Sequence, residues 1–192
     1  DPGFHSDHLI TFAIDPLLSG YTPERALRLF DDLYRRLRSV PGVSSASSAR
    51  QPLLTGDVNM SAYEVEGYQN SEGKHVTLQR NAIGPRFFSV MGIPLMAGRE
   101  FDDSDSGRSQ RVAIVNQTLA KKYFGGRDPL GLHITTAGRE KKPVTAEIVG
   151  VVKDSKYDDV RESPKPFLYR PAAQDESPGT RTLWRRRCRK LR

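Results

Sequence analysis

The residues best suited to chemistry lie in the run 102–107, Asp-Asp-Ser-Asp-Ser-Gly. Alternating carboxylates followed by glycine are typical of a calcium-binding loop, whose pattern is D-x-D/N-x-D/N-G with an acidic closing position. Counted from Asp103, Asp105 fits the third position but Gly107 falls one place early. Counted from Asp102, Gly107 fits but serines replace the next two ligands, and the closing position is apolar in either register. The run therefore predicts an exposed acidic turn and not a calcium site.

Three other patterns that would indicate chemistry are incomplete or absent. The glycine-rich stretch 125–131 follows a predicted helix and lacks the Lys-Ser/Thr pair of a phosphate-binding loop. His5 and His8 flank Asp7 at a spacing that binds metal on a helix, but this segment is predicted to be a loop. No serine lies in a G-x-S-x-G setting. The sequence thus predicts no catalytic residue, no metal site and no cofactor site.

The charge is distributed unevenly along the 192 residues. The net charge is +7, but residues 175–192 carry seven basic and two acidic side chains, leaving +2 for the rest. A terminal run of arginines is a weaker argument for nucleic acid than a basic surface. The single cysteine, Cys188, excludes an internal disulfide. No apolar run approaches the roughly 20 residues of a membrane helix, and the chain, which begins without Met, is expected to be a piece of a longer protein.

The elements that would position such residues begin with a strand–helix–strand unit. A strand is predicted over 9–14, a helix over 23–39 and a strand of small residues over 43–49. Thr22 as N-cap and Pro23 at the first helical position mark the helix start. One face of this helix is apolar and is predicted to be core. The other face is predicted to be solvated and carries Arg25, Arg28, Asp31, Asp32, Arg35, Arg36 and Arg38.

The remainder of the chain reads as short strands with two further helices. Strands are predicted over 61–65, 75–83, 112–115, 133–137, 144–152 and 167–169, an extended segment over 93–96, and helices over 86–91 and from 116 to 124. Gly150 is predicted to form a β-bulge. Helices are too few for a doubly wound sheet, so the predicted fold class is α+β with mixed or antiparallel sheets.

The C-terminal segment stands apart from this pattern. Residues 177–192 show neither strand nor helix periodicity and have a sudden excess of arginine. The chain is therefore predicted to consist of one domain, residues 1–174, and a basic tail, 175–192, that is disordered or non-native. A patch that binds phosphate or a membrane surface is the alternative for the tail.

A resemblance rests on blocks that recur in order over about residues 3–173. They are Gly3-Phe4, the Leu-x-Thr-Phe strand from Leu9, YTPER at 21–25, LRSVPGV at 37–43, FFSVMGIPL at 87–95, AGREF at 97–101, VAIVNQ at 112–117, YFGGRDPLG at 123–131 and IVGVV at 148–152. Together they resemble a MacB-like periplasmic core domain of an ABC transporter permease, in particular the acidobacterial duplicated orphan permeases.

The resemblance implies a fold and a role. Such a domain is inserted after a membrane helix, projects into the periplasm from the inner membrane, and has a porter-like βαβ lobe and a second, β-rich lobe. ATP is hydrolysed by a separate subunit or domain, and the periplasmic domain relays that work to a substrate or partner, commonly within a dimer. Scaffold turns rather than catalytic positions are then implied for Gly92, Pro94, Gly98, Gly125, Gly126, Pro129 and Gly131. The family would continue with another strand and a helix, which residues 175–192 do not resemble.

Two functions from different classes therefore remain. The first is this non-catalytic permease domain, with no nucleic acid as partner. The alternative is a stand-alone module whose basic tail binds nucleic acid or an anionic membrane. Under the first, Asp102, Asp103 and Asp105 and the predicted hairpin tip 68–74 are expected to face a partner, because both read as exposed polar turns.

Overall fold

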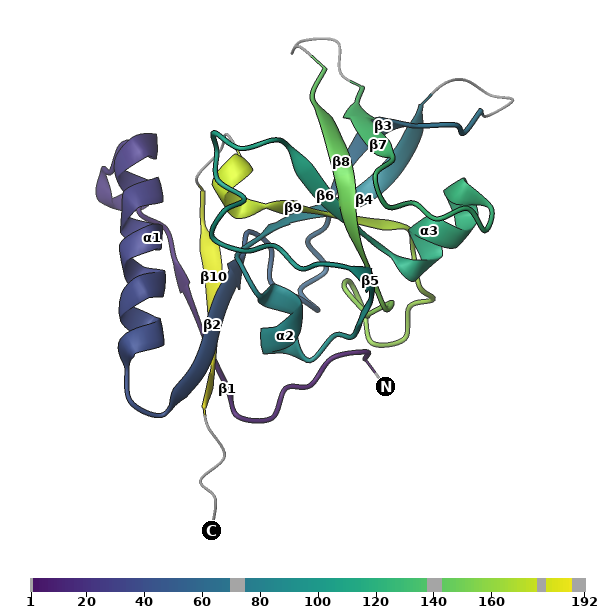
Figure 1. Ribbon diagram of the computed structural model, residues 1–192. Helices are drawn as coiled ribbons and strands as arrows, with labels where there is room; N and C mark the ends of the chain where they lie inside the picture. The colour runs from purple at the N-terminus through teal and green to yellow at the C-terminus, as the bar shows by residue number, and fades with distance from the viewer. Residues whose placement is uncertain (1, 70–74, 138–142, 176–178, 188–192) are drawn as a thin grey trace.

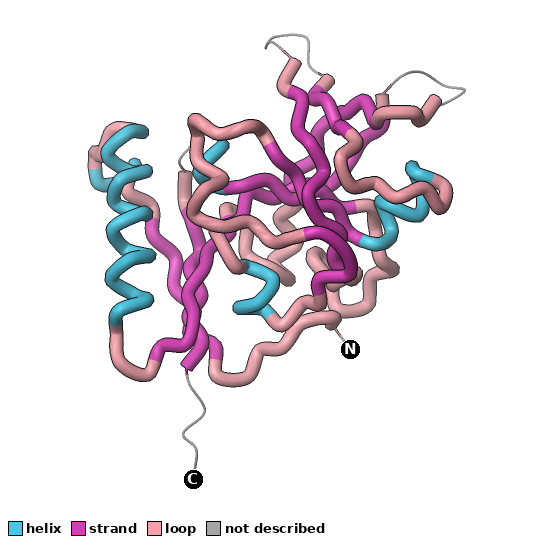
Figure 2. The backbone as a smooth tube through the Cα atoms, viewed as in Figure 1, coloured by secondary structure: helices cyan, strands magenta, loops and turns pink. Residues whose placement is uncertain are grey.

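A computed structural model of the chain describes residues 2–69, 75–137, 143–175 and 179–187 (Figures 1 and 2). Within these ranges the helices are α1 Pro23–Ser39, α2 Phe87–Met91 and α3 Gln117–Phe124. The strands are β1 Leu9–Ile14, β2 Val43–Ala49, β3 Asn59–Val65, β4 Val76–Ile83, β5 Leu95–Gly98, β6 Val112–Asn116, β7 His133–Thr136, β8 Thr145–Val152, β9 Phe167–Pro171 and β10 Arg181–Arg187. Two short 3-10 turns, η1 Leu17–Ser19 and η2 Ala172–Gln174, complete the set.

Helix α1 begins and ends at the predicted residues. The Thr22 hydroxyl accepts a hydrogen bond from the Arg25 backbone nitrogen at 3.4 Å, and Pro23 occupies the first turn, where no backbone donor is required. Ala26, Phe30 and Tyr34 are buried at i, i+4 spacing, which is the apolar face predicted from the sequence.

The first lobe is a three-stranded antiparallel sheet in the order β1-β10-β2. Helix α1 covers one face of this sheet (Figure 1). On that face Leu183 of β10 packs with Phe30 and Tyr34. On the other face Trp184 of β10 meets Phe87 of α2 edge to face, with 5.7 Å between ring centroids. The consecutive residues Leu183 and Trp184 of β10 thus enter two different cores.

The predicted disordered tail is wrong for Arg181–Arg187. These residues form β10, the central strand of the first lobe, paired along its length with β1 and β2. The strand forms because Leu183 and Trp184 are both buried. The arginines around them make this short apolar signal hard to recognise in the sequence. Arg186 is also held by hydrogen bonds to the carbonyls of Val90, Asp7 and His5 at 2.8, 3.1 and 2.8 Å. Residues 188–192 lie outside the described ranges.

The second lobe is a small closed barrel. Strands β3, β4, β9, β6, β8 and β7 pair in a ring, because β4 pairs with β9 in parallel and β7 pairs with β3. Its interior holds Tyr63, Leu78, Ala113, Ile134 and Leu168, and α3 packs on the same core. Strand β5 adds to the outside of β8.

The predicted bulge at Gly150 is confirmed. The register between β6 and β8 moves from Ala113–Ile148 to Ile114–Gly150, so β8 contains one extra residue there. A Cβ atom built on Gly150 would lie 2.4 Å from the Arg99 carbonyl oxygen, and one on Gly98 would lie 2.1 Å from that of Val149. Glycine at these two positions lets β5 approach β8 closely.

The two lobes share one sheet but meet at a narrow junction. Between β2 and β4 the register consists of Ala49 opposite Ile83. A core that includes Ile83, Phe88, Tyr169 and Trp184 extends from one lobe into the other beneath this junction. The α+β fold class is confirmed: a porter-like β1-α1-β2 unit is joined to a β-rich lobe with mixed parallel and antiparallel pairing.

Candidate functional site

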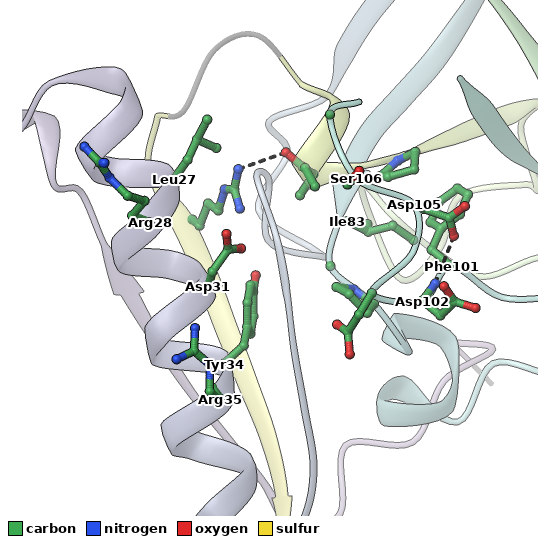
Figure 3. Close-up of a pocket in the computed structure, with 18 of the residues that line it drawn as sticks. Leu27, Arg28, Asp31, Tyr34, Arg35, Ile83, Phe101, Asp102, Asp105 and Ser106 are labelled. Carbon is green, nitrogen blue, oxygen red and sulfur yellow. Dashed lines mark hydrogen bonds between the residues drawn. The ribbon is translucent and has the colours of Figure 1, made fainter. Parts of the chain in front are cut away.

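A cleft of about 750 Å³ separates the two lobes (Figure 3). One wall is α1. The facing wall is the loop 101–108 together with residues 83–85 at the end of β4, and Pro171 to Ala173 and Arg181 complete the lining. The cleft therefore lies where the strand–helix unit faces the barrel. A movement of one lobe relative to the other would change the width of the cleft.

The α1 wall comes from residues three or four positions apart. Leu27, Asp31, Tyr34 and Arg38 follow this spacing and all line the cleft. In Figure 3, Asp31 and Tyr34 lie on the side of α1 that faces the loop carrying Asp102. The predicted solvated face is exposed at Arg28, Asp31 and Arg35. Arg38 is partly buried, and all four residues line the cleft opposite this loop.

An ion pair crosses the cleft between Arg38 and Asp103. The Arg38 Nη1 and Asp103 Oδ2 atoms are 2.9 Å apart, and the Asp103 side chain is 74% exposed. The other terminal nitrogen of Arg38, Nη2, is buried and has no hydrogen-bond partner among the described residues. Exposed ion pairs contribute about 0 to 1 kcal/mol, so this contact can form and break without large cost.

The three loop aspartates have different roles. Asp105 is 4% exposed and accepts two hydrogen bonds from Arg99, both at 2.8 Å, and one from the Asp102 backbone nitrogen at 3.0 Å. The expectation that Asp105 faces a partner is therefore wrong, because its carboxylate is turned inward to hold the loop. Hydrogen bonds from the Ser104 hydroxyl and backbone lower the pKa of Asp102. Asp102 and Asp103 remain at the surface.

Arg181 connects the cleft wall to its floor. Its guanidinium carbon lies 4.4 Å from the centroid of the Phe30 ring, and its Nη2 donates to the Ala172 carbonyl at 3.0 Å. Burial raises the pKa of the nearby Asp31 carboxyl, and the positive charge of Arg181 opposes that shift. Asp31 is thus a carboxylate at the surface of the cleft, close enough to Arg181 for its charge to act on it.

Tyr34 and Gly84 fix the closest approach of the two lobes. The Tyr34 and Ser48 hydroxyls share a buried hydrogen bond, and burial raises the pKa of Tyr34. The Gly84 backbone nitrogen donates to the Ser48 carbonyl at 2.7 Å. A Cβ on Gly84 would lie 3.1 Å from the Tyr34 hydroxyl oxygen. A side chain at this position would therefore push the floor of the cleft apart.

The arrangement supports binding or movement better than bond chemistry. The cleft brings together five arginines and five carboxylates, but no hydroxyl in it pairs with a general base and an orienting group. Across the described ranges, no group of three or more His, Cys, Asp or Glu residues is placed to hold a metal ion. The His5 backbone nitrogen donates a hydrogen bond to the Met91 carbonyl at 2.8 Å, which connects the N-terminal segment to α2.

The turn residues lie away from the cleft. Gly92 and Gly125 end α2 and α3 with φ of 69° and 59°, and Gly98, Gly126 and Gly131 also have positive φ, at 74°, 88° and 77°. Pro94 and Pro129 each offer a carbonyl, to Lys153 and Leu132, at 2.9 and 3.1 Å. The hairpin tip at 70–74 lies outside the described residues, and Tyr68 before it packs on Tyr123.

The family model for the MacB-like periplasmic core domain matches residues 3–187. The chain belongs to this family. The match runs through β10, so the last strand that the structure describes is part of the family domain and not an appendage to it. The assignment to the acidobacterial type of permease stays a prediction.

Curated relatives agree with the family. The macrolide export ATP-binding/permease protein MacB of Neisseria gonorrhoeae is 33% identical over 86 residues, which are 45% of this chain and 12% of that protein. A probable syringafactin export ATP-binding/permease protein of Pseudomonas syringae is 37% identical over 82 residues, 42% of this chain and 12% of the relative. The aligned segments thus span only about an eighth of these relatives' length.

Two solved structures share the fold. The periplasmic region of MacB from Actinobacillus actinomycetemcomitans aligns over 99% of this chain and 78% of its own, with a TM-score of 0.61 and 18% identity. The extracellular domain of the ABC-type transporter YknZ aligns over 95% of this chain and 83% of its own, with a TM-score of 0.56 and 17% identity. Among the described residues no helix is both long and apolar enough to cross a bilayer.

Proposed function

We propose that the chain is the extracytoplasmic part of an export-type ABC permease and that it relays ATP-driven conformational change by opening and closing the cleft between its lobes. ATP is hydrolysed on a separate nucleotide-binding domain, and the chain itself is non-catalytic. The full permease works as a dimer at the periplasmic face of the inner membrane and engages a periplasmic partner or the exported substrate.

The cleft is the observation that carries this proposal. The sheet joins the lobes through a short β2–β4 contact with a shared core beneath it, and the Arg38–Asp103 pair at the surface spans the gap between them. A hinge needs a small junction and contacts that exchange at low cost, and both are present here. The family membership supplies the transport context.

Asp102 and Asp103 are the residues we propose to face the partner. Both lie at the surface of the loop that forms one wall of the cleft. A partner with basic side chains that bound Asp103 would compete with Arg38 for the same carboxylate. Partner binding and cleft opening would then be coupled through one ion pair.

The alternative, a stand-alone module with a basic tail, has lost much of its support. Arg181 is buried and Arg186 donates three hydrogen bonds to backbone carbonyls, so neither is a free cation for nucleic acid or anionic lipid. Because β10 is also part of the family match, Arg181 and Arg186 belong to the folded domain.

Cross-linking the cleft in the full permease tests the proposal. With Cys188 replaced by serine, Arg38→Cys and Asp103→Cys would be joined by a short bismaleimide. Because a coupled transporter links hydrolysis to movement, the cross-link is expected to lower ATP turnover of the reconstituted permease severalfold. Turnover unaffected by complete cross-linking would refute the relay.

A matched control joins two positions within one lobe. Thr135 and Thr145 lie opposite each other on β7 and β8, with 2.9 Å between their hydroxyl oxygens. Thr135→Cys and Thr145→Cys, treated with the same reagent, should leave turnover unchanged, because their cross-link cannot restrain the movement of one lobe against the other.

A further inference from the structure

Three arginines converge at one end of the barrel, away from the cleft lining. In the parallel pairing of β4 and β9, Arg80 lies opposite Leu168 and Arg170 lies opposite Ala82. Arg50 follows β2 and donates its backbone nitrogen to the Ala82 carbonyl at 2.9 Å. Helix α3 follows β6, which runs antiparallel to β9, so α3 lies at the start of β9 and the arginines lie toward the opposite end.

This cluster has more positive than negative charge. The carboxylate of Asp175 accepts from Arg50 Nη1 at 3.0 Å and lies 3.8 Å from Arg170 Nη2. Among the described residues we find no second carboxylate paired with these cations, which leaves two positive charges in excess. Burial lowers the pKa of Arg80, and the positive charge of Arg170 lowers it further. The guanidinium groups are thus partly desolvated and repel one another.

Several donors in the cluster are unused. Arg80 donates Nε to the Ser61 hydroxyl at 2.7 Å, and its terminal nitrogens donate to no other described residue. Arg170 Nε is buried without a partner in the described ranges, and so is the hydroxyl of Tyr63, a residue that is 1% exposed. Burial raises the pKa of Tyr63, and the positive charges of Arg170 and Arg80, together with the neighbouring Ser61 hydroxyl, oppose this shift. The protonated hydroxyl is therefore a donor beside the guanidinium groups.

We propose that this cluster binds an oxyanion with two negative charges, namely phosphate or a phosphate monoester. Two excess cations match that charge, and planar guanidinium groups match the spacing of phosphate oxygens. Tyr63 would supply a neutral hydrogen bond. The site can be reached from solvent, because the side chains of Arg50 and Arg170 are 31% and 22% exposed. Binding would satisfy donors that the fold leaves buried and unpaired, which otherwise oppose folding.

Titration with inorganic phosphate tests the site. Binding to the 192-residue chain would be measured by calorimetry and by the unfolding temperature, with sodium chloride of equal ionic strength as reference. Phosphate is expected to raise the unfolding temperature, and Arg170→Gln should weaken binding about tenfold to a hundredfold. Arg35→Gln, the same change at a side chain that is 77% exposed, should bind like the wild type.

A second variant separates binding from folding. Tyr63→Phe removes only a hydroxyl that has no partner among the described residues, so it should leave stability without phosphate unchanged or higher. With phosphate it should bind severalfold more weakly. Glycerol phosphate that binds as tightly as inorganic phosphate would identify an organic phosphate as the ligand. Glycerol phosphate that binds more weakly than inorganic phosphate would identify the free ion. No stabilisation beyond that of chloride, or wild-type binding in both Arg170→Gln and Tyr63→Phe, would overturn the proposal.

Discussion

The guanidinium of Arg181 lies over the ring of Phe30, with 4.4 Å between the guanidinium carbon and the ring centroid. This contact joins the last described strand to the first helix, two elements more than 140 residues apart in the chain. Because Arg181 also donates to the Ala172 carbonyl at 3.0 Å, one side chain connects α1, β10 and η2 at the base of the cleft.

Removing this contact should destabilise the protein measurably. Arg181→Gln loses the cation–π contact and leaves a buried carbonyl without its donor, for an expected loss of about 2 to 3 kcal/mol in the free energy of unfolding. Urea denaturation checks this. The control is Arg35→Gln, at a largely exposed position on α1, which should change the free energy of unfolding by less than about 0.5 kcal/mol. Equal effects of the two changes would contradict the role of Arg181.

Leu183 tests whether β10 is a structural strand. It is fully buried against Phe30 and Tyr34, so Leu183→Ala should cost about 2 to 5 kcal/mol of unfolding free energy. Leu18→Ala is the matched control, because Leu18 is 88% exposed. Hydrogen exchange should also show the amides of β10 among the protected ones. If Leu183→Ala left the free energy of unfolding unchanged and the β10 amides exchanged fast, the C-terminal segment would be disordered as the sequence predicts.

The sequence predicted the elements whose signals are local. Thr22 and Pro23 fixed the start of α1, and the pair Asn116 and Gly125 bounded α3, since capping depends on a few neighbouring residues. The Gly150 bulge could likewise be anticipated from a glycine within an apolar run. These features needed no knowledge of distant parts of the chain.

What the sequence could not predict depends on long-range pairing. The parallel contact of β4 with β9 closes the barrel and gathers Arg80 and Arg170, although nothing near either residue signals the other. Leu183 escapes sequence-based prediction because two apolar residues among the four arginines of β10 do not form a recognisable period. The acidic run predicts an exposed Asp105, because such runs are usually solvated, whereas in the structure Arg99 pairs with it. Helical spacing places Asp31 and Arg38 on one side of α1, but nothing near them in the sequence indicates that the loop 101–108 lies opposite.

Two glycines with similar backbone angles should respond differently to alanine. Gly98 and Gly20 have φ of 74° and 76°, so both variants incur the cost of a left-handed residue, about 1 to 2 kcal/mol. A Cβ on Gly20 meets nothing within 4 Å, whereas one on Gly98 would lie 2.1 Å from the Val149 carbonyl oxygen. Gly98→Ala should therefore lose about 1 to 3 kcal/mol more than Gly20→Ala. Thermal unfolding that ranked the two variants equally would show that β5 does not pack closely on β8.

Asp31 should make part of the stability depend on pH. Burial raises the pKa of its carboxyl above the ordinary value near 3.8, so the folded state binds this proton more tightly than the unfolded state. The stability that follows is present at low pH and is lost as the pH rises through the raised pKa. Asp31→Asn removes the titration. The variant should gain stability over the wild type at neutral pH, and this gain should vanish toward about pH 3.5.

Glu24 at the start of the same helix provides a control of opposite sign. Its own backbone amide and the Thr22 hydroxyl lower the pKa of Glu24 below the ordinary 4.5. Its contribution is therefore present above that value and is lost as the pH falls through the lowered pKa. Glu24→Gln should lose stability at neutral pH and converge with the wild type in acid. Urea unfolding from about pH 3.5 to 7 measures both differences. A stability change for Asp31→Asn that is negative at pH 7, or constant across the range, would show that Arg181 outweighs burial at this carboxylate.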